Sequence, residues 1–146
     1  MKGLREEMIA VFKPIQEETF CSVVQKSGCK GDREVAAFLL DHPALEGEEG
    51  FGRVPPTTIV RAKYYNGDRK TEWERGSLQG FIPNKKWKPK EFAVDDVQRL
   101  SLIDIRFGNN DRHCGNILKS NINGGRLIPI DHGEYFPMEW NNYTFI

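Results

Sequence analysis

Three oxygen-bearing side chains lie near one another late in the sequence, beside runs of apolar residues. Asp111 and Asn116 belong to NNDRHCGNIL at 109–118, and Asp131 belongs to LIPIDHGEYFP at 127–137. A carboxylate next to a buried strand is costly unless it has a partner or takes part in chemistry. We therefore ask which elements bring these side chains together and what they could bind.

Two short apolar runs around SNINGG predict a β-hairpin. NILK at 116–119 and RLIPI at 126–130 have the composition of strands, and the Asn and Gly between them suit a tight turn. Antiparallel pairing returns the second strand to the end where the first began. Asn116 and Asp131 are therefore expected to face one point, where an amide and a carboxylate oxygen suit a hard cation such as Mg²⁺.

The spacing of these residues is typical of kinases. Asp111 lies five residues before Asn116, across a loop, and can reach a substrate hydroxyl beside the metal. A base, then a metal ligand after four intervening residues, and a second metal ligand after a hairpin form the kinase arrangement. Asp-Arg-His and Asp-His-Gly are each often ordinary loops or turns, but their order around the hairpin favours the catalytic interpretation.

Cysteine usage favours reduced thiols in a cytosolic setting. The three cysteines, Cys21, Cys29 and Cys114, are odd in number and show no C-x-x-C pair. A zinc site built from His113, Cys114 and His132 fits less well than the magnesium hypothesis. An adjacent His and Cys have no usual ligand spacing, and a fourth ligand is missing.

The clearest helix is predicted for AVDDVQRLSLIDIRFGN at 93–109, directly before the polar cluster. Asp95 and Asp96 in its first turn suit the helix dipole. Gly108 and Asn109 are suitable terminators. The apolar residues that share one predicted face are Val94, Val97, Leu100, Ile103 and Phe107.

The remaining pattern alternates strands with one further helix, which indicates an α+β chain. A helix is predicted at 33–42, with Asp32 as its N-cap and Pro43 as its stop. A strand with its apolar part at 9–12 ends at Lys13. The other predicted segments are a strand at 57–65, a turn at 66–74 that starts a partner strand, a strand at 76–83 and a basic linker at 84–92.

Composition sets broad limits on function. The chain has 146 residues and a formal net charge of zero, which suits one domain and argues against broad electrostatic binding of nucleic acid. No apolar run approaches the roughly 18 residues of a membrane span. The charged N-terminal stretch does not have the pattern of a signal peptide.

The sequence resembles the catalytic segments of phosphatidylinositol 3- and 4-kinases, most closely the type II phosphatidylinositol 4-kinases of the plant gamma group. LIDIRFGNNDRHCGNIL and LIPIDHGEYFP carry the most specific likeness. Four further stretches agree with that group: AVFKP at 10–14, REVAAFLLDHP at 33–43, RVPPT at 53–57 and GSLQGFIP at 76–83. The resemblance implies a partial protein-kinase-like fold, truncated at both ends, with an N-lobe and hinge at about 1–83 and the start of a C-lobe at about 84–146. A Gly-rich phosphate loop before AVFKP and a helical remainder of the C-lobe are expected outside it.

The resemblance also implies a role for individual residues. Lys13 matches the lysine that contacts ATP phosphates, and Glu34 is its candidate ion-pair partner, with Glu17 and Glu18 as competitors. Asp111 matches the catalytic aspartate, and Asn116 and Asp131 match the metal ligands. Gln79, Gly80, Phe81 and Ile82 are expected to form the hinge whose backbone binds adenine. Arg112 is expected to order the loop, whereas His113 and His132 either stabilise transferred charge or are structural.

The implied activity is transfer of the ATP γ-phosphoryl group to an inositol hydroxyl of phosphatidylinositol, with Mg²⁺ or Mn²⁺ as the metal. The alternatives are a protein serine/threonine kinase of the same fold and an inactive nucleotide-binding module. The implied location is cytoplasmic, with peripheral membrane contact. Four lysines around Trp87, at 85, 86, 88 and 90, could touch an anionic membrane surface or form a solvated linker.

Overall fold

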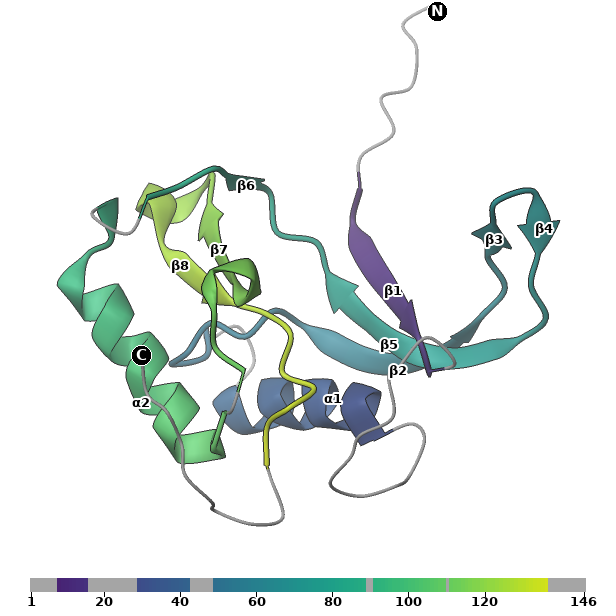
Figure 1. Ribbon diagram of the computed structural model, residues 1–146, viewed down its shortest axis with the longest axis horizontal. Helices are drawn as coiled ribbons and strands as arrows, with labels where there is room; N and C mark the ends of the chain where they lie inside the picture. The colour runs from purple at the N-terminus through teal and green to yellow at the C-terminus, as the bar shows by residue number, and fades with distance from the viewer. Residues whose placement is uncertain (1–7, 16–28, 43–48, 89–90, 110, 137–146) are drawn as a thin grey trace, which may run out of the picture.

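The computed structural model describes residues 8–15, 29–42, 49–88, 91–109 and 111–136 of the chain (Figure 1). Its two α-helices and eight strands confirm the predicted α+β class. In chain order the elements are β1 (Ala10–Pro14), α1 (Cys29–Asp41), β2 (Thr57–Ala62), β3 (Tyr65–Asn66), β4 (Arg69–Lys70), β5 (Glu74–Gly80), β6 (Asn84–Lys85), α2 (Val94–Phe107), a 3₁₀ turn (Cys114–Asn116), β7 (Ile117–Ser120), a second 3₁₀ turn (Asn123–Gly125) and β8 (Leu127–Pro129).

The first sheet has the order β1-β5-β2, with β5 antiparallel to both neighbours. Lys13 pairs with Ser77, and Thr57 pairs with Gln79, so the first part of the chain and the predicted hinge are joined by main-chain hydrogen bonds. Helix α1 lies along this sheet and contacts β2 and β5 (Figure 1). The sheet therefore holds Lys13 above the first helix.

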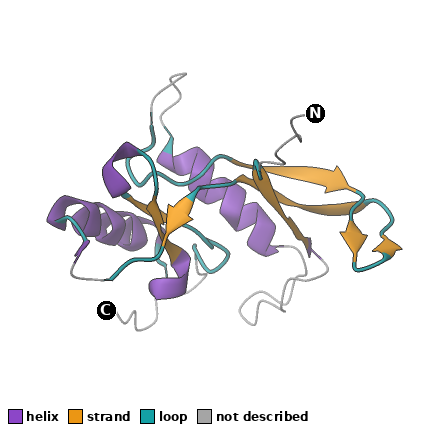
Figure 2. Cartoon of the chain, turned by 90° about the horizontal axis from the view of Figure 1, so that it is seen from above, coloured by secondary structure: helices purple, strands orange, loops and turns teal. Residues whose placement is uncertain are grey.

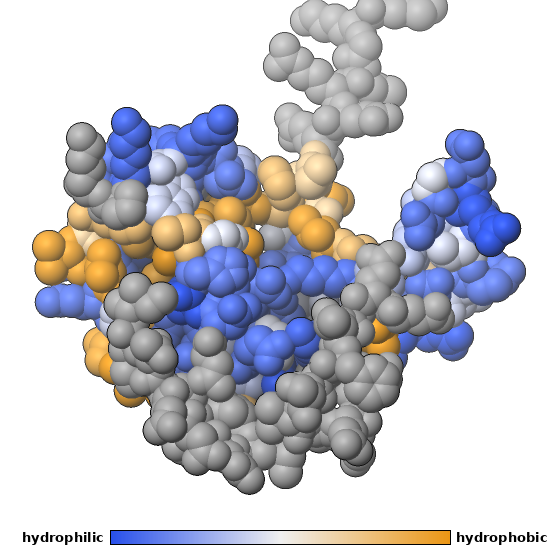
Figure 3. Space-filling view, viewed as in Figure 1, coloured by the Kyte–Doolittle hydropathy of each residue, from blue (hydrophilic) through white to orange (hydrophobic). Residues whose placement is uncertain are grey.

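Strands β3 and β4 form a small ribbon that projects from the first sheet, away from both helices (Figure 2). The turn between them is the predicted one, and Gly67 in it has a φ of 61°, a conformation that glycine adopts without strain. The ribbon is strongly hydrophilic (Figure 3). It therefore takes no part in the hydrophobic core.

The second sheet has the order β6-β7-β8 and contains the predicted hairpin. Ile117 pairs with Pro129, so Asn116 and Ile130 lie opposite each other at the open end of the hairpin. The Ile130 N–H donates to the Asn116 carbonyl over 3.0 Å. Helix α2 packs against β8. Antiparallel pairing thus brings Asn116 close to the residue that precedes Asp131, as predicted.

The hydrophobic core lies between the two helices and the segment that follows β8. Phe107 stacks obliquely on Tyr135 with ring centroids 5.7 Å apart, and Tyr135 is fully buried. The buried members of this core are Ala37, Val54, Ile103, Phe107 and Tyr135. Because Tyr135 comes soon after Asp131, the core anchors the segment that carries the predicted metal ligand.

A buried carboxylate fixes the residues directly before β2. Asp41, at the end of α1, accepts hydrogen bonds from the backbone N–H groups of Gly52 (2.6 Å) and Val54 (2.9 Å). A side chain on Gly52 would collide with Ile103, so glycine is needed for this close approach. Asp41 therefore supplies the hydrogen bonds that two buried backbone donors of these residues require.

Helix α1 begins at Cys29, so the prediction that Asp32 is its N-cap was wrong. Asp32 lies in the first turn and pairs with Arg75 over 2.6 Å. Tertiary contacts support the earlier start, because Lys30 pairs with Glu134 over 2.6 Å and its stem packs on Gly133.

Two strand predictions and one linker prediction also need correction. Strand β2 ends at Ala62, and β5 runs from Glu74 to Gly80 rather than over 76–83. The predicted linker at 84–92 begins with β6, because Asn84 pairs with Ser120 at the free edge of β7. A short polar strand of this kind has no distinctive sequence pattern.

Helix α2 is confirmed, with Gly108 in the left-handed conformation at its C-terminus. Its predicted buried face was partly wrong, because Val94 is 69% and Val97 42% exposed. Asp96 lies on the buried face instead, where the Arg53 guanidinium donates to it over 2.5 Å and the Leu127 N–H over 3.2 Å. These charged hydrogen bonds set the rotation of the helix. Over the described residues, no helix combines the length and apolar character needed to cross a bilayer.

We predict that Asp41→Asn lowers the free energy of unfolding by about 1–3 kcal/mol, because an amide can accept only one of the two buried N–H bonds. Urea unfolding at equilibrium measures the change. Asp32→Asn is the matched control, since both partners of its ion pair are about half exposed, and it should cost no more than about 0.5 kcal/mol. Equal losses in the two variants would contradict the assigned role of Asp41.

Candidate active site

An ion pair between β1 and α1 forms the centre of the site. Lys13 Nζ lies 2.6 Å from Glu34 Oε1, and Glu34 is almost fully buried. The predicted ion pair between these residues is therefore confirmed. Sheet pairing places Lys13, and the packing of α1 on the sheet places Glu34, so two elements of regular structure fix the pair.

Lys13 also contacts the segment after the hairpin. Its Nζ lies 3.3 Å from Asp131 Oδ1, across 118 residues of sequence. Asp131 adopts a φ of 61°, which is uncommon for any residue other than glycine but is best tolerated by Asp and Asn. Its side chain is 54% exposed, so the carboxylate remains open to a ligand. A strained, accessible carboxylate beside a lysine is typical of a functional site.

The second oxygen of Glu34 has its own partners. Glu34 Oε2 lies 3.3 Å from His132 Nδ1 and 3.5 Å from Gln79 Nε2, and Gln79 also donates to Thr57 Oγ1 over 3.1 Å. Both carboxylate oxygens are thus hydrogen-bonded, as a buried charge requires. The network joins β1, α1, β2, β5 and the segment that begins at Asp131.

Partner charges decide the ionisation of this network. Burial acts to raise the pKa of Glu34, but the hydrogen bond from His132 and the charge of Lys13 prevail and lower its pKa to about 2. Burial acts to lower the pKa of Lys13, but Glu34 and Asp131 together raise it. Burial lowers the pKa of His132 despite its carboxylate partner. Near neutral pH the centre thus contains a lysine cation, a glutamate anion and a neutral imidazole.

The predicted catalytic aspartate and the predicted amide ligand touch each other. Asn116 Nδ2 donates to the Asp111 carbonyl over 2.8 Å and approaches Asp111 Oδ2 at 3.4 Å. Asn116 is buried, whereas the Asp111 side chain is 50% exposed. Because the Asn116 amide nitrogen faces Asp111, its oxygen is the atom left for a cation. The roles of both residues stay predictions.

Arg112 orders this loop, as predicted. Its guanidinium donates to the Asn116 carbonyl (2.6 Å), the Ile130 carbonyl (3.1 Å) and Asp104 on α2 (3.0 Å), and also to the Tyr135 hydroxyl (2.7 Å). Tyr135 in turn donates to Asp104 over 2.8 Å. Arg112 therefore joins the residue before β7 and the residue after β8 to α2, which holds Asn116 in place.

The zinc alternative gains no support. His132 is fully buried with its Nδ1 on Glu34, whereas His113 and Cys114 are exposed. Within the described part of the chain, no group of three His, Cys, Asp or Glu side chains could hold a metal ion. An oxygen site for a hard cation would instead combine Asp131 with the Asn116 amide and water, since Mg²⁺ keeps several waters.

The predicted hinge leads from the first sheet to the second. The Gly80 N–H donates to the Pro56 carbonyl over 2.8 Å, and the Phe81 N–H donates to the Ile9 carbonyl over 3.0 Å. Gln79 points its side chain at Glu34 and Thr57. Gln79 also pairs with Val11 and Thr57 in the sheet, so the predicted contact with adenine is left to the hinge backbone that follows the Phe81 N–H.

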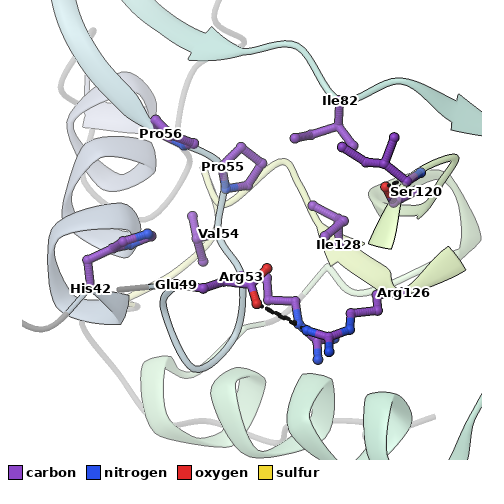
Figure 4. Close-up of a pocket in the computed structure, with 11 residues that line it drawn as sticks. His42, Glu49, Arg53, Val54, Pro55, Pro56, Ile82, Ser120, Arg126 and Ile128 are labelled. Carbon is purple, nitrogen blue, oxygen red and sulfur yellow. Dashed lines mark hydrogen bonds and ion pairs between the residues drawn. The ribbon is translucent and has the colours of Figure 1, made fainter. Parts of the chain in front are cut away.

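A cavity of about 240 Å³, shown in Figure 4, is lined by none of Lys13, Glu34 and Asp131. Ile82 is the one predicted site residue that lines it. Glu49 lines it and pairs with Arg53 (3.7 Å) and Arg126 (3.1 Å). The walls come from the end of α1, the residues before β2, the hinge and the β7–β8 hairpin, and the cavity contains none of the predicted catalytic side chains.

Sequence reasoning missed several residues that support the site. Asp96 and Asp104 are buried on the same helical face as Leu100, and Tyr135 is buried beside Arg112. The available signal was periodicity, because Asp96, Leu100 and Asp104 follow one another at four-residue spacing. An aspartate that shares the apolar face of a helix is expected to be buried, and a buried aspartate needs a cationic partner such as arginine.

The chain belongs to the family of phosphatidylinositol 3- and 4-kinases, since the sequence model of that family matches residues 2–145. This confirms the resemblance given by the two polar stretches around the hairpin.

Curated proteins of the plant gamma group are among the chain's relatives. The chain is 37% identical over 169 residues to phosphatidylinositol 4-kinase gamma 4 of Arabidopsis thaliana, with 95% of this chain and 30% of that protein covered. It is 38% identical over 167 residues to phosphatidylinositol 4-kinase gamma 4 of Oryza sativa subsp. japonica, with 96% and 29% covered. The chain thus spans about 30% of the length of these relatives. No solved structure matches it significantly.

We predict that stability falls as the pH drops from 4.5 towards 2, because Glu34 has an ordinary pKa of 4.5 and a folded-state pKa of about 2. The depressed pKa stabilises the fold above pH 4.5, and protonation removes that contribution, on the order of 3 kcal/mol in full. Urea unfolding of wild type and Glu34→Gln at pH 7, 4.5 and 3 measures it.

In Glu34→Gln this part of the pH dependence should vanish. Glu72→Gln is the control, since the Glu72 side chain is 92% exposed and its variant should keep the wild-type slope. Identical slopes for Glu34→Gln and wild type would show that Glu34 is not the titrating group.

Proposed function

We propose that this chain is part of the catalytic domain of a phosphatidylinositol kinase that transfers the γ-phosphoryl group of ATP to an inositol hydroxyl. One observation carries the proposal. Lys13 on β1 meets both Glu34 on α1 and Asp131 after β8, which lies 118 residues further along the chain. A lysine shared by a helical glutamate and a metal-binding aspartate is the arrangement that kinases use to hold ATP phosphates.

In this proposal residues 1–83 form the N-lobe and hinge, and residues 84–146 form the start of the C-lobe. Lys13 binds phosphate oxygens as a point charge that Glu34 orients. The hinge from Gln79 to Ile82 carries the adenine. These residues position the nucleotide, which matters because phosphoryl transfer depends mainly on positioning and charge neutralisation.

Asp111 orients the attacking hydroxyl and accepts its proton. The half-exposed carboxylate and its contact with Asn116 suit this role, because the acceptor must be accessible and held in place. The Asn116 oxygen and Asp131 would hold Mg²⁺ or Mn²⁺, which when bound neutralises phosphate charge. Arg112 holds this loop in place through its bonds to the carbonyls of Asn116 and Ile130, at the open end of the hairpin.

The likeness to proteins named phosphatidylinositol 4-kinases supports a phosphatidylinositol substrate. A cytoplasmic location with peripheral membrane contact is part of the same proposal. Trp87 donates to the Ile117 carbonyl over 3.2 Å and stacks on Phe92, which fixes the basic stretch against β7. Lys85, Lys86 and Lys88 are exposed around it. Exposed lysines on an anchored segment suit contact with anionic lipid headgroups.

We predict that the protein phosphorylates phosphatidylinositol in vesicles with Mg-ATP, and that Asp131→Asn or Asp111→Asn lowers turnover by about a hundredfold or more. Radiolabelled phosphate transfer measures this, with a protein mixture as a parallel substrate. Asp68→Asn, in the exposed β3–β4 turn, should keep wild-type activity.

Circular dichroism should show that all three variants remain folded. Transfer to proteins but not to lipid would place the chain with protein kinases. The absence of both transfer and calorimetric Mg-ATP binding would refute the proposed function.

A further inference from the structure

We propose that His132 is a positioning residue that locks the Glu34 carboxylate onto Lys13 and joins α1 to the segment carrying Asp131. This inference deepens the proposed function and relies on it for the catalytic consequence. The hydrogen bond between His132 and Glu34 lies wholly within the described residues. Its role in placing Glu34 can be tested without measuring phosphoryl transfer.

His132 occupies a rigid position. It has no exposed surface and meets Tyr135 edge to face, with ring centroids 4.6 Å apart. The Tyr135 hydroxyl is itself held by Asp104 and Arg112. A ring enclosed in this way cannot change rotamer without disrupting the core, so its Nδ1 is a fixed donor.

Glu34 needs such a donor. Its carboxylate lies at the end of a flexible side chain, and a single bond to Lys13 would leave it free to rotate. The Glu34 oxygens are divided, with Oε1 on Lys13 at 2.6 Å and Oε2 on His132 at 3.3 Å. Gln79 approaches Oε2 only at 3.5 Å, and therefore contributes less. His132 is the stronger of the two described constraints on this oxygen.

The proton on His132 can be placed from geometry. A carboxylate oxygen only accepts, so Nδ1 must carry the hydrogen whether the ring is neutral or charged. Among the described side chains, His132 Nε2 is the one buried polar atom without a hydrogen-bond partner. As an unprotonated acceptor it is tolerable, whereas as an N–H it would be an unpaired buried donor. Both nitrogens therefore favour the tautomer with hydrogen on Nδ1.

Three side chains on one face of α1 contact the segment that contains His132. Lys30 pairs with Glu134 over 2.6 Å, and Arg33 donates to the Gly133 carbonyl over 3.1 Å. Together with Glu34, these residues follow i, i+3, i+4 spacing and contact three consecutive residues. Because His132 follows Asp131 directly, a displacement of α1 would move the predicted metal ligand as well.

A matched pair of variants isolates the hydrogen bond. Asn and Leu have nearly the same branched shape, but only Asn places an N–H donor near the position of Nδ1. We expect His132→Leu to lower kcat for phosphoryl transfer by at least about tenfold, with a smaller change in the KM for ATP, and His132→Asn to restore most of the rate. Equal activities in the two variants would overturn the positioning role.

Two measurements do not depend on turnover. Crystal structures of both variants should show Glu34 Oε1 displaced from Lys13 in His132→Leu and in contact with it in His132→Asn. An unchanged Lys13–Glu34 contact in the leucine variant would overturn the proposal. Nitrogen-15 NMR of wild type should show hydrogen on His132 Nδ1, and a ring protonated only at Nε2 would equally exclude it, even if a variant failed to fold.

If wild-type protein transfers no phosphate, the proposed function fails, while the structures and the NMR tautomer still decide the role of His132. If transfer occurs but the leucine and asparagine variants behave alike, only the positioning role fails.

Discussion

The charge on Glu34 is the constraint around which this structure is arranged. A carboxylate that is almost fully buried is stable only when both oxygens are paired, and its partners come from three separate parts of the chain. Lys13 pairs with one oxygen, and His132, with a weaker contribution from Gln79, pairs with the other. The contacts of the site therefore also hold the fold together, because pairing the Glu34 carboxylate brings the first sheet, α1 and the segment after β8 into contact.

Arg112 likewise joins separate elements, namely α2, the β7–β8 hairpin and the segment after it. Its guanidinium uses its planar set of donors on two backbone carbonyls, a carboxylate and a hydroxyl. Lysine could not satisfy this geometry, because its single ammonium cannot span the hairpin and α2. The two networks meet at the contact between the rings of His132 and Tyr135, so the parts that hold Lys13 and those that hold Asn116 share one rigid junction.

Local pattern was enough to predict the hairpin, α2 and the approach of Asn116 to the end of β8, because turn chemistry and apolar periodicity act over a few residues. The start of α1 was not predictable in this way, since Lys30 is drawn into the helix by Glu134 and Gly133, over a hundred residues away. The buried face of α2 was misjudged for a related reason. Val94 and Val97 have the right hydrophobicity, but the pairing of Asp96 with Arg53 decides which side turns inward.

The great sequence separation of the contacts in the site bears on how the protein folds. Lys13 and Asp131 are 118 residues apart, and Glu34 and His132 are 98 apart. Closing such large loops costs conformational entropy. Chains rich in distant contacts therefore fold more slowly than chains with mainly local contacts. We expect the helices and the β7–β8 hairpin to form early and the Lys13–Glu34–His132 connections to form among the last. A partly folded intermediate would thus have most of its secondary structure before it has the lysine, glutamate and aspartate in contact.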